Sequence, residues 1–202
     1  QNTHMISNLQ NIIKRISEVT KDLSWLDSIR ANVLKMTNFS DKELLLMDKI
    51  HEDRYPKPVL KNFMCQYLLS QTYMDMFDEN KRISVFCDEA DLLEAHHIIP
   101  LGSAKKVGEC TAALRKNPRH ICNSPLNFVY ITKTANKDIS DDSLEVYESK
   151  IQPAAKDALR ITSYIATQCD SESKVHGLLE NRYKMLYGAI TDEIQTLLIN
   201  WR

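Results

Sequence analysis

The sequence predicts a mainly α-helical protein, with helices on both sides of a short central segment of different character. The 202 residues include only four glycines, and no proline occurs before Pro56, which favours long helices over a multi-stranded sheet. Apolar residues also recur at steps of three and four before and after residues 93–140, which is the period of a helix with one buried face. With 43% hydrophobic and 26% charged residues, the chain has the composition of a globular protein.

Three helices are predicted before the central segment. The first covers residues 6–33, where apolar positions follow the helical period. Ser40 followed by Glu43 has the form of a capping box, which predicts a second helix over 44–50. A proline suited to a first helical turn then begins a third helix, predicted over 58–77.

The region after the third helix is less uniform. Residues 83–87 alternate well enough for a strand, but five residues fit a helix end equally well. The polar residues 141–143 can cap a helix over 144–151, and a proline begins another helix over 153–165. Residues 175–198 carry the clearest helical stripe of the chain.

The predicted elements group into a helical N-terminal subdomain, residues 5–80, and a central and C-terminal region, residues 81–202. We expect them to form one compact unit, because no Gly/Ser-rich linker separates them. The chain has five widely spaced cysteines and no Cys-x-x-Cys pair, which argues against a structural zinc site or a disulfide framework. It also has neither a run of about 18 apolar residues nor a signal peptide, so a cytoplasmic protein without a membrane span is expected.

Charge is distributed unevenly along the chain. The formal net charge is −1, but residues 98–140 contain seven Lys or Arg against two Asp or Glu, a surplus of +5 that leaves −6 for the remainder. A basic zone in an acidic body is what local phosphate binding requires. A solvated loop with an accidental surplus of lysine would give the same count.

The motif that carries chemistry lies inside this zone. It begins with Glu94-Ala95-His96-His97-Ile98-Ile99-Pro100 and continues with Asn127 and Asn136. Phosphodiester hydrolysis needs a base for water and a cation for the phosphate charge, and histidine and amide side chains can supply or hold both. Neighbouring side chains of a strand point to opposite faces, so a strand must end at the histidine pair if both are to face one site.

These residues resemble the HNH (ββα-metal) nucleases, in which two strands and a closing helix hold one divalent metal. The resemblance implies a small ββα insert in the helical body. It also implies that His96 is a metal ligand, that His97 is the general base, that Asn127 bonds the loop backbone and so orients His97, and that Asn136 is the second ligand. Mg²⁺ is the expected ion, with Mn²⁺ or Ni²⁺ able to substitute. Taken singly, Asn127 could be a turn residue and Asn136 a helix cap.

The match is closest to the C-terminal HNH domain of GmrSD-type proteins, which are modification-dependent restriction and phage-defence enzymes. It rests on Leu114-Arg115-Lys116, on the run from Asn123 through Asn127 to Ile131, and on Lys133 to Ser140. Such proteins often carry an NTPase domain that senses modified DNA, so the chain is expected to be an excised nuclease domain or to work with a separate partner. The family often has a carboxylate where His96 stands, and here Glu94 lies two residues earlier.

We therefore expect a metal-dependent DNA endonuclease with weak sequence specificity and salt-sensitive binding. The side chains expected to contact DNA phosphates are Lys133, Lys137, Arg115, Lys116 and Arg119. His120 lies in the same basic zone and could touch phosphate or metal, but a surface loop histidine is the expected role. An inactive module that binds nucleic acid or a partner protein is the alternative, and an RNA-directed nuclease of the same chemistry is a third possibility.

Overall fold

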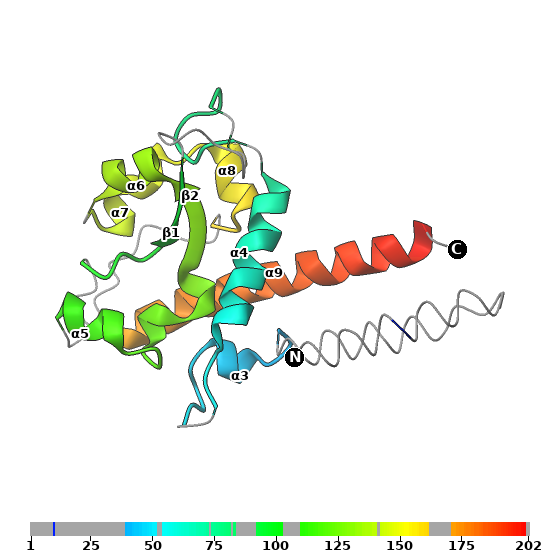
Figure 1. Cartoon of the computed structure of the whole chain (residues 1–202), viewed down its shortest axis with the longest axis horizontal. Coiled ribbons are helices and arrows are strands. Elements are labelled where there is room, and N and C mark those ends of the chain that lie inside the picture. The colour runs from blue at the N-terminus through cyan, green and yellow to red at the C-terminus, as the bar shows by residue number, and fades with distance from the viewer. Residues whose placement is uncertain are drawn as a thin grey trace. The chain divides into compact units, whose positions relative to one another are not determined.

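The computed structural model describes residue 10 and residues 39–51, 54–72, 74–81, 83, 92–102, 110–140, 142–161 and 171–200. The chain divides into two compact units, residues 1–40 and 41–202, and the second unit is described below (Figure 1). Apart from residue 10, the predicted helix over 6–33 lies outside the described residues, as does most of the segment 83–87. None of the helices in the described ranges combines the length and apolarity needed to cross a membrane.

Within the described part, the unit is mainly helical with a small two-stranded antiparallel sheet, which confirms the predicted fold class at this level. Strand β1 (Leu93–His97) pairs with β2 (Phe128–Thr132), so that His96 lies opposite Val129 and His97 opposite Phe128. Helix α6 (Lys133–Ile139) follows β2 directly and contacts both strands. The sheet lies between α6 and α4 (Pro58–Gln71) in Figure 1.

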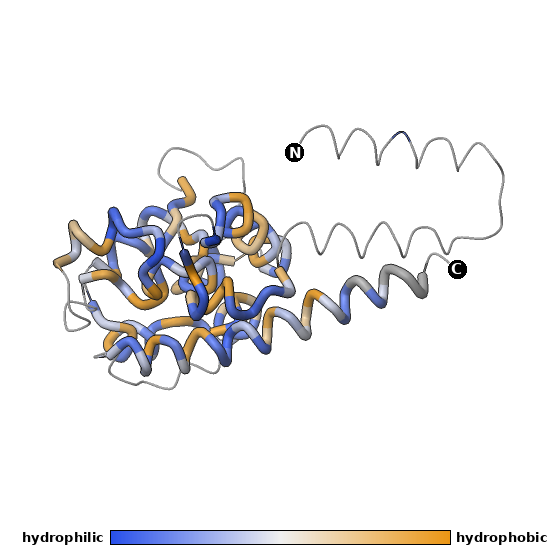
Figure 2. Tube along the Cα trace, turned by 90° about the horizontal axis from the view of Figure 1, so that it is seen from below, coloured by the Kyte–Doolittle hydropathy of each residue, from blue (hydrophilic) through white to orange (hydrophobic). Residues whose placement is uncertain are grey.

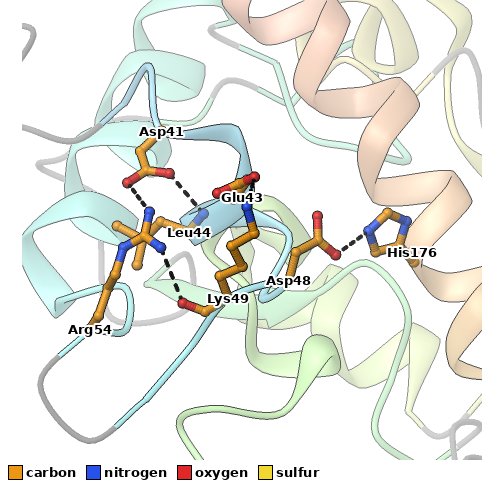
Figure 3. Close-up of polar contacts among 7 residues, drawn as sticks. All are labelled: Asp41, Glu43, Leu44, Asp48, Lys49, Arg54 and His176. Atoms are coloured by element: carbon orange, nitrogen blue, oxygen red, sulfur yellow. Dashed lines mark hydrogen bonds and ion pairs between the residues drawn. The ribbon is translucent and has the colours of Figure 1, made fainter.

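The first described helix, α3 (Lys42–Leu45), corrects the prediction over 44–50. Its cap is Asp41, whose carboxylate accepts a hydrogen bond from the Leu44 N–H (3.0 Å), so the predicted capping box at Ser40 is wrong by one residue. Asp41 is also held by Arg54 (2.8 Å), as Figure 3 shows. The helix is short because Met47 has φ 61°, a left-handed conformation that interrupts a helix.

Helix α4 ends at Gln71, so the prediction that it runs to residue 77 is wrong. Beyond it Asp75 is buried, and its carboxylate accepts hydrogen bonds from the Phe77 N–H (2.9 Å) and from the Thr132 hydroxyl (2.5 Å). A buried carboxylate needs such partners. The chain therefore leaves the helix and turns, which brings Asp75 to the end of β2.

The two helices after α6 are also shorter than predicted. Helix α7 (Leu144–Tyr147) continues as a 3₁₀ turn, η5 (Glu148–Lys150), and α8 (Pro153–Ala158) ends seven residues before the predicted limit at 165. Arg160 has φ 55°, a left-handed conformation that interrupts a helix. The rest of the predicted helix, residues 162–165, lies outside the described residues.

Helix α9 (Glu172–Asn200) confirms the helix predicted over 175–198. Figure 2 shows hydrophobic and hydrophilic residues alternating along it. On its inner side the Arg182 side chain is fully buried and donates hydrogen bonds to the backbone carbonyls of Leu126, Phe128 (3.2 Å) and Leu159 (3.0 Å). One guanidinium thus ties α9 to the start of β2 and to the end of α8.

Two 3₁₀ turns and one short helix complete the connection between the strands. Helix α5 (Thr111–Lys116) is followed by η3 (Ile121–Asn123) and η4 (Pro125–Asn127), and both turns contact α9. The buried Ser124 hydroxyl donates to the Leu45 carbonyl (2.5 Å) and accepts from the Leu126 N–H (3.1 Å). These contacts fix the chain that leads into β2.

Candidate functional site

A pocket of about 470 Å³ opens where β1 ends. Its walls come from β1, the turn after it, α5 and α6, and they include Ala95, His96, His97, Pro100, Leu101, Gly102, Arg115, Asn136, Lys137 and Ser140. Both histidines reach this pocket although they are neighbours in the chain. This is because β1 ends at His97 and the backbone then turns through residues 98–101.

His96 meets Asn136 inside this pocket. The ring is buried, and its Nδ1 lies 2.8 Å from the Asn136 Oδ1 atom, while Nε2 has no hydrogen-bond partner among the described residues. Burial lowers the pKa of His96 to about 4, although the Asn136 contact acts in the opposite direction. The ring is therefore neutral at pH 7 and keeps one nitrogen lone pair.

The amide of Asn136 is held on its other side by Glu94. Its Nδ2 donates to the Glu94 carboxylate at 2.7 Å. Asn136 does not cap α6, since Thr132 is the N-cap and Ser140 the C-cap. The Thr132 hydroxyl accepts from the Ala135 N–H (3.1 Å) and so fixes the first turn of the helix that carries Asn136.

His97 is oriented by a residue that the sequence did not single out, Asn123. The His97 Nε2 atom lies 3.1 Å from the Asn123 Oδ1, and the Asn123 amide group donates to the carbonyls of Leu114 (2.6 Å) and Asn117 (2.8 Å). Because both amide hydrogens are used, Oδ1 faces the ring and Nε2 must be the donor. The lone pair of neutral His97 is therefore on Nδ1.

The surroundings of His97 also keep it uncharged. Burial is the main reason that its pKa falls to about 4, and the nearby positive charges of Lys61 and Arg115 lower it further. The ring packs against Phe128, with centroids 4.2 Å apart, as expected from their pairing across the two strands. No spacing rule gives Asn123 a role in the sequence, although it begins the run 123–131 on which the family resemblance rests.

Asn127 holds the turn that follows the histidines. It is fully buried, its Oδ1 accepts from the Ile99 N–H (2.9 Å), and its Nδ2 donates to the carbonyls of Ile99 (3.2 Å) and Cys122 (2.8 Å). The Tyr147 hydroxyl donates to the Ile98 carbonyl in the same turn. Asn127 is thus more than a turn residue, because its side chain bridges η3 to the backbone that follows His97.

The five side chains expected to contact DNA phosphates lie in different surroundings. Arg115 and Lys137 line the pocket, whereas Lys116, Arg119 and Lys133 do not. Arg119 instead lies over the Tyr55 ring, 5.5 Å from its centroid, where Lys57 also lies at 3.9 Å.

A further cation from outside the basic segment approaches the site. The Lys61 Nζ of α4 lies 4.5 Å from the Phe128 ring centroid, next to the ring on which His97 packs. The segment 98–140 therefore does not contain all the positive charge near His97.

The expectation for His120 is wrong, because this side chain is buried and does not line the pocket. Its Nδ1 accepts from the Cys122 N–H (3.2 Å) and caps η3, and its Nε2 lies 3.6 Å from a Glu172 carboxylate oxygen. The local use of its ring nitrogens gives His120 a structural role.

Among the residues that the structure describes, no three His, Cys, Asp or Glu side chains gather as a metal-binding group. The pair formed by His96 and Asn136 joins an imidazole to an amide and is therefore not such a group. No model of a known protein family matches the chain, and no curated protein or solved structure is significantly similar to it.

Proposed function

We propose that the chain is a metal-dependent DNA endonuclease of the HNH type, in which β1, β2 and α6 form the ββα element. The observation that carries this proposal is the meeting of two functional groups in one pocket. The His96 ring meets the Asn136 amide oxygen, with Nδ1 and Oδ1 2.8 Å apart, and the neutral His97 lines the same space.

The His96 ring and the Asn136 amide offer ligand atoms of the kinds that a small divalent cation takes. Their 2.8 Å contact is a hydrogen bond between Nδ1 and Oδ1, so a cation held by both atoms would take the place of the Nδ1 hydrogen, and the ring would carry its hydrogen on Nε2. Imidazole nitrogen and amide oxygen are acceptable ligands for Mg²⁺, Mn²⁺ or Ni²⁺ when water completes the shell. The cation would neutralise charge on the phosphate and on the departing oxygen.

His97 supplies the base in this proposal. Its Nδ1 keeps a lone pair because Asn123 accepts the hydrogen of Nε2, and a neutral ring can take a proton from water. A phosphate in the pocket would bring negative charge close to the ring and favour its protonated form. The ring would then hold the proton more readily when substrate is bound than when the pocket is empty.

The charge at the mouth of the pocket favours a phosphodiester substrate. Arg115 and Lys137 line the wall and are exposed, and Lys61 lies close to His97. Contacts of this kind bind the backbone of any sequence and weaken as salt rises. On the resemblance alone, we also propose that the chain acts in a restriction or phage-defence system, with an NTPase partner that senses modified DNA.

Cleavage of supercoiled plasmid with Mg²⁺, Mn²⁺ or Ni²⁺ tests the proposal directly. His97→Ala should abolish cutting and leave DNA binding unchanged, because a base acts mainly in the transition state. His176→Ala is the matched control: this histidine lies in α9, bonds Asp48 (2.7 Å) as Figure 3 shows, and does not line the pocket.

Two results would contradict the proposal. Undiminished cutting by His97→Ala would show that His97 is not the general base. A chain that retards DNA in a gel but cuts neither DNA nor RNA with any of the three ions would be a binding module instead.

A further inference from the structure

Glu94 contacts Asn136 but has no part in the chemistry proposed above. It lies on β1 two residues before His96, so the alternation of the strand places both side chains on the same face. From there its Oε2 accepts a hydrogen bond from the Asn136 Nδ2 at 2.7 Å, across 42 residues of sequence.

This contact decides which way the Asn136 amide faces. A primary amide has an oxygen at one side and a nitrogen at the other, and it could turn either towards His96. A carboxylate can only accept, so Glu94 takes the NH₂ group and leaves the oxygen towards His96. Because that oxygen also only accepts, His96 must donate from Nδ1 in the metal-free protein.

We propose that Glu94 is a positioning residue that keeps the oxygen of Asn136, and never its NH₂ group, turned towards the metal site. The inference rests on the proposed function, in which Asn136 is a ligand. An NH₂ group has no lone pair to offer a cation, so a turned amide would remove one of the two protein ligands. Groups that orient ligands in this way commonly change metal affinity ten- to hundredfold when they are replaced.

The first test measures Mn²⁺ affinity of the full chain by titration calorimetry. Glu94→Leu removes the acceptor and should weaken binding about ten- to hundredfold. Glu94→Gln retains an oxygen that can still accept from Asn136, so its loss should be clearly smaller. Glu145→Leu, which replaces a half-buried glutamate of α7 outside the pocket, should leave the affinity unchanged.

The second test needs neither metal nor activity. Imidazole ¹⁵N shifts in the metal-free chain report which ring nitrogen carries hydrogen, and His96 should be in the Nδ1–H form. In Glu94→Leu the amide can turn, and His96 should become a mixture of the Nδ1–H and Nε2–H forms. Circular dichroism identifies variants that fail to fold, and Glu94→Gln provides the measurement if Glu94→Leu is one of them.

The outcomes separate this inference from the proposed function. If the wild-type chain binds no Mn²⁺, the proposed metal site is refuted. The tautomer of His96 in Glu94→Leu would still show whether Glu94 orients the Asn136 amide. Wild-type binding with unchanged affinity in Glu94→Leu overturns the positioning role alone. Equal losses in Glu94→Leu and Glu94→Gln with an unchanged His96 tautomer would make Glu94 a direct ligand, and that also overturns the inference.

Discussion

Replacing Asn127 by aspartate tests how the turn after β1 is held. The two side chains have nearly the same shape, but the second lacks the NH₂ group that bonds the carbonyls of Ile99 and Cys122. An ionised carboxylate would keep the bond from the Ile99 N–H and face two carbonyl oxygens at full burial. We therefore expect the buried aspartate to take up a proton, which restores one donor.

The free-energy change follows from this proton. One lost hydrogen bond costs about 1 kcal/mol, and protonating an acid of pKa about 3.9 at pH 7 costs about 4 kcal/mol at 1.36 kcal/mol per unit. Asn127→Asp should thus lose about 5 kcal/mol of unfolding free energy at pH 7, comparable with the whole stability of a marginal domain. The folded-state pKa is raised, so the loss grows as pH rises above the unfolded value and shrinks as pH falls.

Urea unfolding at pH 7 and pH 5 measures this difference relative to wild type at each pH. Between these values the deficit of Asn127→Asp should fall by about 2.7 kcal/mol, two units at 1.36 kcal/mol each. Asn127→Ala is the control, because it removes the same contacts without an ionisable group and should lose about 3 kcal/mol at both values. A deficit of Asn127→Asp that is small and equal at pH 5 and pH 7 would refute the buried hydrogen-bond geometry.

Three further predictions follow from other contacts. Lys61→Ala should lower the slope of log binding constant against log salt concentration by about one unit. Lys49→Ala is the control, because Lys49 pairs with Glu43 (2.6 Å), and its slope should not change. Identical slopes for the two variants would show that Lys61 does not contact DNA. Iodoacetamide at pH 8 should label the exposed Cys110 well before Cys65, because burial raises the pKa of Cys65 to about 11 and the thiolate is the reactive form; equal labelling by peptide mass analysis would contradict this. Arg182→Met should lower the unfolding free energy by about 3 kcal/mol through lost charge-assisted hydrogen bonds, and a loss under about 1 kcal/mol would show that these bonds do not hold α9.

The sequence predicted where the helices lie better than where they end. The period of apolar residues identified α9, because a 29-residue helix with one buried side repeats the pattern many times. The ends of α4 and α8 depend on contacts with distant parts of the chain. Asp75 leaves the helical path to meet Thr132, and the carbonyl of Leu159 is bound by Arg182. No local pattern encodes either contact.

The candidate site likewise contains residues that the sequence identified and residues that it did not. A family resemblance identified His96 and Asn136, and the structure brings their side chains within hydrogen-bond distance across 40 residues, while their role as ligands stays a prediction. Asn123 was missed because its importance lies in a bond to His97 that the fold creates. His120 was misjudged for the opposite reason: a histidine in a basic segment resembles a surface residue until burial is known.

Asparagine suits this pocket for a physical reason. The two histidines must be neutral, with the lone pair of His97 on a chosen nitrogen, and an amide can fix a tautomer without bringing charge. Aspartate at position 123 would place a negative charge beside the His97 ring, favour its protonated form and remove its capacity as a base. Among the described residues, the carboxylate that bonds Asn136 is Glu94, and the amide links it to His96. The Asn136 amide therefore fixes which nitrogen of His96 carries the hydrogen, and it separates the Glu94 carboxylate from the imidazole ring.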